Sequence, residues 1–177
     1  MKITFTRTGE HTYTTSVLRD DGVTLEVPSY DRTAPLPHDL AHYVVERELG
    51  LKQGFWGCVA DGAMFGGMTV ISGRRRPHAG ARSQVVLREA GQHGTEAEVF
   101  VGVLVRIMHA GLDTAPASLM PAAHALLSRE WKPDKPARGP LAADEVRRVC
   151  AALRETEQRW QALAVGESLT VTWPRDK

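Results

Sequence analysis

Both ends of the chain alternate polar and apolar residues, the pattern of half-buried strands. The first 28 residues contain three such stretches, and the turn-forming pair Asp21-Gly22 joins the last two. Residues 167–174 alternate in the same way. Because an isolated hairpin is marginal in water, we expect the last strand to join the N-terminal strands. The pattern therefore predicts a mostly antiparallel, four-stranded sheet built from both chain ends.

Helical periodicity fills the middle of the chain, residues 37–165. Gly50 and Gly111 follow two of the periodic segments as stop signals, and Thr95 and Glu98 have the spacing of a capping box. Residues 84–88 suggest a short extra strand. The five predicted helices cover residues 38–49, 55–65, 95–110, 118–131 and 141–165. We predict a single α+β domain over residues 1–177, in which about five helices cover the sheet.

The predicted helix 95–110 is apolar around most of its circumference. Its polar positions are Glu98, Gly102, Arg106 and His109, which fall on one narrow strip. A helix of this composition is expected to lie centrally in the fold. Its polar strip would then face a cleft, a partner or water.

Steps of four residues place His38, His42 and Glu46 on one face of the first predicted helix. Two imidazoles and one carboxylate suit a divalent metal, zinc above all, and leave a fourth position for water. Asp39 stands where the zincin motif His-Glu-x-x-His has its general base. We assign Asp39 as an orienting group or weak base. The pattern predicts a metal-binding protein with hydrolase-type chemistry.

The segment from His38 to His42 is similar to the His-Asp-x-x-His zinc motif of a coenzyme Q biosynthesis family. In that family a glutamate further along the chain supplies the third ligand, at the position that Gly54 occupies here. The similarity is confined to five positions, so it identifies no family.

The same residues also fit a structural role. Pro37 and Asp39 favour the start of a helix, and the histidines would then be packing residues. The alternative is a non-enzymatic interaction or structural module. Its partner would be another protein or a second copy, bound through the amphipathic helix 141–165.

Three further side chains are weaker candidates for chemistry. His109 and His124 are alternative metal ligands, although lone histidines on apolar helices are more often core residues. Cys58 with His42 would form a nucleophile and base, but a small buried thiol is the better interpretation.

Charge gives little guidance about partners. The formal net charge is +1, so nothing attracts the whole chain to nucleic acid or to a membrane. Locally, Arg74, Arg75, Arg76 and Arg106 are candidates for binding an anionic ligand. No aromatic residues interleave with this basic cluster, so nucleic acid is not expected. The expected partner is a small molecule or a protein.

The sequence predicts a cytoplasmic protein. Its start lacks the apolar core of a secretory signal, and the longest apolar run, residues 99–108, is too short to cross a bilayer. Cys58 and Cys150 lie in helix-like segments and suit reduced, buried thiols.

Overall fold

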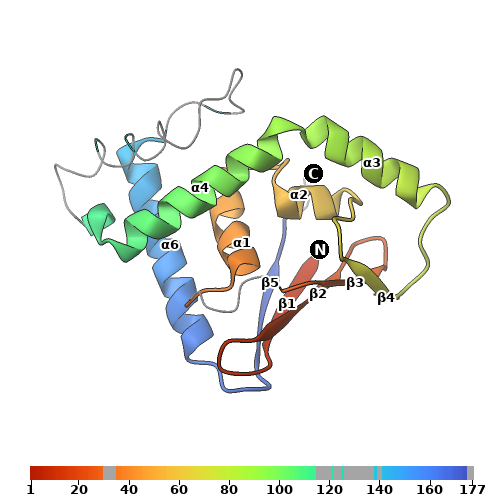
Figure 1. The fold of residues 1–177 in the computed structure, drawn as a ribbon, viewed down its shortest axis with the longest axis horizontal. Coiled ribbons are helices and arrows are strands. Elements are labelled where there is room, and N and C mark those ends of the chain that lie inside the picture. The colour runs from red at the N-terminus through yellow and green to blue at the C-terminus, as the bar shows by residue number, and fades with distance from the viewer. Residues whose placement is uncertain (30–34, 115–120, 122–124, 126–137, 139–140, 175–177) are drawn as a thin grey trace.

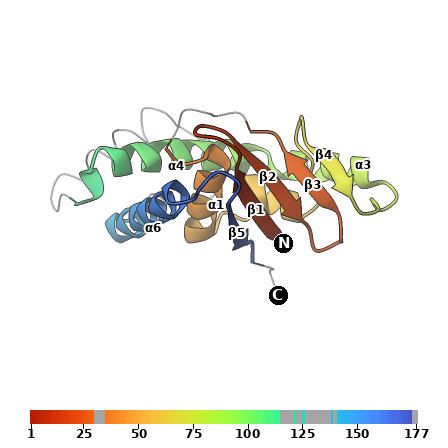
Figure 2. The same cartoon turned by 90° about the horizontal axis from the view of Figure 1, so that it is seen from below.

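A computed structural model describes residues 1–29, 35–114 and 141–174, together with the single positions 121, 125 and 138. It confirms the α+β class, with one antiparallel sheet and five α-helices among the described residues. The helices gather on one side of the sheet (Figures 1 and 2). Both chain ends enter the sheet, as the alternating segments predicted.

The sheet has five strands rather than the predicted four. The strands are β1 (Lys2–Arg7), β2 (Tyr13–Leu18), β3 (Thr24–Val27), β4 (Thr69–Ser72) and β5 (Ser168–Thr172). Their order is β4-β3-β2-β1-β5, and every neighbouring pair is antiparallel. The additional strand is β4, at one edge. All four of its residues are exposed, so no alternation of buried and exposed positions marks it in the sequence.

Four of the five predicted helices are present among the described residues, and one helix, at Ala79–Ala90, was not predicted. The helices are α1 (His38–Leu49), α2 (Phe55–Ala60), α3 (Ala79–Ala90), α4 (Gln92–His109) and α6 (Ala143–Gln161), with a short 3-10 helix at Leu112–Thr114. The prediction for α1 is confirmed, whereas α2 and α6 are shorter than predicted. The predicted helix 118–131 lies almost entirely outside the described residues.

Two local interpretations of the middle segment are wrong. Residues 84–88 belong to α3, so the extra strand predicted there is absent. Thr95 and Glu98 both lie inside α4, which begins at Gln92 after Gly91, so they form no capping box. Glu98 is thereby free of a helix-capping role, and its carboxylate turns toward α1 instead.

The core joins the inner face of the sheet to α1, α4 and α6. Ile3, Phe5 and Val17 are fully buried on that face. The ring of Phe5 meets Trp56 of α2 edge-on, with centroids 6.0 Å apart. Trp56 Nε1 donates a 2.8 Å hydrogen bond to the carbonyl oxygen of Asp39, which ties α2 to the first turn of α1.

The remaining predictions concern α6, the cysteines and the membrane. The apolar residues of α6 are buried in this core, against α1 and α4. Cys58 and Cys150 are buried free thiols. None of the described helices combines the length and the apolar composition that a membrane span requires.

Gly50 ends α1 in a left-handed conformation, with φ of 66°. Because a side chain is strained there, Gly50→Ala is expected to lower the free energy of unfolding by about 1 kcal/mol. Gly102, inside α4, is the matched control, since a Cβ added there meets no atom within 4 Å. Gly102→Ala is expected to raise stability by about 0.5–1 kcal/mol. Urea denaturation measures both, and equal losses would contradict the assignment.

Candidate metal centre

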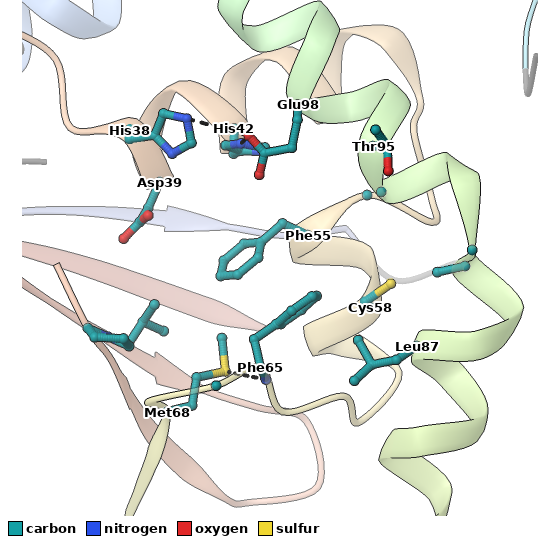
Figure 3. A pocket seen from close by; sticks show the side chains of 17 residues that line it. His38, Asp39, His42, Phe55, Cys58, Phe65, Met68, Leu87, Thr95 and Glu98 are labelled. Carbon is teal, nitrogen blue, oxygen red and sulfur yellow. Dashed lines mark hydrogen bonds and ion pairs between the residues drawn. The ribbon is translucent and has the colours of Figure 1, made fainter. Parts of the chain in front are cut away.

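A cavity of about 570 Å³ opens between the start of α1, α2, the residues before β4 and the junction of α3 with α4 (Figure 3). Its polar side chains come from two helices: His38, Asp39 and His42 from α1, and Thr95 and Glu98 from α4. Apolar side chains supply much of the remaining wall, among them Val27, Phe55, Phe65, Met68, Leu87 and Ala90. An apolar cavity with a small number of convergent polar groups is typical of a ligand-binding site.

His38, His42 and Glu98 lie close enough together to share one ion. One ligand atom from each of them lies within 4.8 Å of the other two. Glu98 Oε2 is 3.2 Å from His42 Nε2 and 3.6 Å from His38 Nε2. Ligand atoms around tetrahedral zinc are about 3.3 Å apart, given bonds of about 2.0–2.1 Å. Small side-chain rotations would therefore bring the three groups to coordinating distance.

Glu46 lies on the same face of α1 as the histidines, but its carboxylate points toward the start of α2. Its carboxylate is fully buried and accepts three hydrogen bonds: from the backbone N–H of Phe55 at 2.8 Å, from that of Trp56 at 2.9 Å, and from His42 Nδ1 at 2.9 Å. The carboxylate thus joins α1 to the first turn of α2. It also fixes the imidazole of His42, as carboxylates commonly do for metal-binding histidines.

His42 is the most constrained member of the group. Its side chain is only 3% exposed, and Nδ1 is engaged by Glu46. Nε2 lies 3.2 Å from Glu98 Oε2 and forms an ion pair with it when the ring is protonated. Among the described residues, this buried nitrogen has no other polar partner. A metal ion between Nε2 and Glu98 would replace that pair.

Electrostatics at His42 and Glu98 reflect their mutual contact. Burial by itself would lower the pKa of His42, but the carboxylates of Glu46 and Glu98 outweigh it and raise that pKa to about 9. The contact with His42 lowers the pKa of Glu98. Without a metal the pair is therefore an imidazolium and a carboxylate at neutral pH.

Asp39 lines the same cavity beside His38. Its side chain is buried, and Thr15 Oγ1 donates to Oδ2 at 3.5 Å. Burial raises the pKa of Asp39 to about 6, although the charge of His42 partly offsets this. A carboxyl group that titrates near neutral pH inside a cavity is suited to proton transfer.

The other candidates lie elsewhere or are inert. Cys58 lines the cavity, but burial raises its pKa to about 11, so the thiol stays protonated at neutral pH. His109 is exposed and pairs with Glu157 at 3.3 Å, outside this cavity. His124 lies outside the described residues.

The four arginines predicted to bind an anion do not reach the cavity. Arg74, Arg75 and Arg76 are exposed in the segment after β4. Arg106 is exposed on α4, where its Nε donates to the carbonyl oxygen of Gly102 at 3.0 Å. The described residues that line the cavity include no lysine or arginine. The basic residues are thus separate from the candidate metal centre.

The metal-free protein is expected to lose stability between about pH 6.5 and pH 9. The pKa of His42 is about 9 in the fold against an ordinary value of 6.5. The stability that its protonated ring contributes is therefore fully present below pH 6.5 and is lost as the pH rises through 9. The loss is expected to be about 2–3 kcal/mol.

Urea denaturation in the presence of a chelator measures this loss. His42→Gln removes the titrating group and is expected to flatten this part of the curve. Asp39 does not interfere, because its raised pKa of about 6 acts below the window. Parallel curves for the wild type and His42→Gln would contradict the assignment.

The chain matches no protein-family model, no curated protein and no solved structure. The chemistry of the cavity is therefore the basis on which a function is proposed.

Proposed function

We propose that this protein binds a divalent metal ion, with zinc as the first candidate, and carries hydrolase-type chemistry. The ligands would be His38, His42 and Glu98. The observation that carries the proposal is the convergence of these three side chains, one ligand atom of each lying within 4.8 Å of the other two. A bound cation would take the place of the proton that Nε2 of His42 shares with Glu98.

Two histidines and one carboxylate would leave a coordination position for water on a four-coordinate ion. Zinc in such a site lowers the pKa of a bound water to about 7 and so supplies hydroxide at neutral pH. Asp39 faces the same cavity, next in the chain to one ligand. Its proposed role is to accept a proton from that water or to hold it by a hydrogen bond.

A structural role for the histidines is the second candidate, and one observation favours it. Glu46, His42 and the first N–H groups of α2 form a connected network that joins two helices without any metal. In that case the protein would be a non-enzymatic interaction module. This alternative assigns no role to His38, whose ring lies beside His42 and Glu98 in the same cluster.

Metal content tests the proposal directly. Protein purified without a histidine tag and then titrated with zinc, iron or manganese is expected to hold about one equivalent of metal by plasma mass spectrometry. His38→Ala is expected to abolish it with little effect on folding, because that side chain is 46% exposed. His11→Ala is the matched control, since His11 is 67% exposed and lies apart from the cavity. Absence of bound metal after titration would overturn the proposal.

A further inference from the structure

We infer that the cavity beside the metal centre binds an uncharged, largely apolar organic molecule whose polar end lies against His38, His42 and Glu98. The inference rests on the proposed function only in taking that polar end to reach a metal. Three observations support it: the distribution of side chains on the wall, the charges there, and the free space at the α3–α4 junction.

The wall is divided into a polar and an apolar part. His38, His42 and Glu98 gather at one end, while Phe65 and Leu87 lie away from them (Figure 3). Phe55 and Phe65 stack at a tilt of 31° with ring centroids 4.8 Å apart. The ring of Phe55 also lies 6.0 Å from that of His42, so the aromatic wall begins beside the metal ligands. A ligand held at the polar end would therefore extend along apolar side chains.

The charges on the wall disfavour an anion. Its carboxyl groups are Asp39 and Glu98, and no lysine or arginine of the described chain lines it. With a divalent ion held by two neutral histidines and Glu98, the charge of Asp39 would leave the centre close to neutral. A phosphate or carboxylate deeper in the cavity would be desolvated without a cationic partner, which is costly.

Small residues at the α3–α4 junction leave the cavity open. Ala90, Gly91 and Gly94 line it there, and a Cβ added at Gly94 would meet no atom within 4 Å. The resulting volume of about 570 Å³ lies in the range of small-molecule sites, about 300–1,000 Å³. Position 94 therefore allows the cavity to be filled without disturbing its wall.

The first experiment tests whether the cavity binds an apolar molecule when no metal is present. The uncharged dye N-phenyl-1-naphthylamine is expected to bind the chelator-treated full chain saturably, with a rise in fluorescence. Gly94→Leu is expected to weaken this binding at least about tenfold, because its side chain occupies the cavity. Gly102→Leu is the control: it lies on the same helix, also has open space, and does not line the cavity. Absence of dye binding, or equal weakening in both variants, would overturn the inference.

The second experiment uses isothermal titration calorimetry on zinc-loaded protein. It compares the affinities of ligands that share a metal-binding end and differ in the chain attached to it. Each buried methylene strengthens binding about fourfold. Octanohydroxamic acid is therefore expected to bind at least about 100-fold more tightly than acetohydroxamic acid, and succinic monohydroxamic acid no more tightly than acetohydroxamic acid. Equal affinities for the two aliphatic acids, or preference for the charged one, would overturn the inference. Dye binding without zinc uptake would instead overturn the proposed function and support the apolar cavity.

Discussion

Zinc binding is expected to weaken more than about 100-fold in Glu98→Ala, while the free energy of unfolding changes by less than about 1 kcal/mol. The carboxylate of Glu98 lies 3.2 Å and 3.6 Å from Nε2 of the two histidines, so its loss removes one of three ligands. Even residues that only orient a ligand contribute 10–100-fold to metal affinity, and a ligand contributes more. Stability is little affected because the side chain of Glu98 is 57% exposed.

Competition against a fluorescent zinc chelator gives the affinity, and urea denaturation of the metal-free protein gives the stability. Glu89→Ala, at an exposed position of α3, makes the same change of charge away from the cavity and is expected to leave zinc affinity unaltered. Glu98→Gln keeps the shape of the side chain without its charge and is expected to bind zinc weakly. Wild-type affinity in Glu98→Ala would exclude Glu98 as a ligand.

Local signals explain why α1 could be predicted with its ends. Proline at position 37 and glycine at position 50 bracket the helix, and the four-residue step between His38 and His42 is a property of the helix itself. The antiparallel strands at the chain ends carried equally local signals. The edge strand β4 carried none, since all four of its residues face solvent.

The third member of the histidine cluster could not be found by spacing along the chain. Glu98 comes from α4, and only tertiary packing brings it to α1. Its signal was the polar strip on an otherwise apolar helix, which predicted that this strip faces a cleft, a partner or water. The capping-box spacing with Thr95 competed with that interpretation, because it offered the same carboxylate a local partner.

Glu46 was predicted as a ligand because helical geometry places it on the face of His38 and His42. Whether a carboxylate on that face binds a metal or a backbone depends on what packs above it. Here Gly54 brings the chain so close that a Cβ at that position would lie 2.4 Å from Glu46 Cδ. The N–H groups of Phe55 and Trp56 then point at the carboxylate. The spacing of α1 alone carries no information about this contact.

Replacing Glu46 by alanine is expected to lower the free energy of unfolding by about 3–5 kcal/mol. The carboxylate is fully buried and accepts hydrogen bonds from the N–H groups of Phe55 and Trp56 and from His42 Nδ1. Its removal leaves these donors unsatisfied and opens a cavity between α1 and α2, with the imidazolium of His42 paired to Glu98 alone. Zinc affinity is expected to fall about 10–100-fold as well, because the ring of His42 loses its orienting partner.

Urea denaturation and zinc competition on the same preparations separate the two effects. Glu155→Ala, at an exposed position of α6, is the control and is expected to change stability by less than about 0.5 kcal/mol. Glu46→Gln keeps the volume and one acceptor oxygen but sets its NH₂ group against a donor, so an intermediate loss of about 1–3 kcal/mol is expected. A loss for Glu46→Ala no larger than that of the control would show that the hydrogen bonds from Phe55 and Trp56 do not hold α1 to α2. Complete loss of zinc binding with unchanged stability would instead indicate that Glu46 is itself a metal ligand.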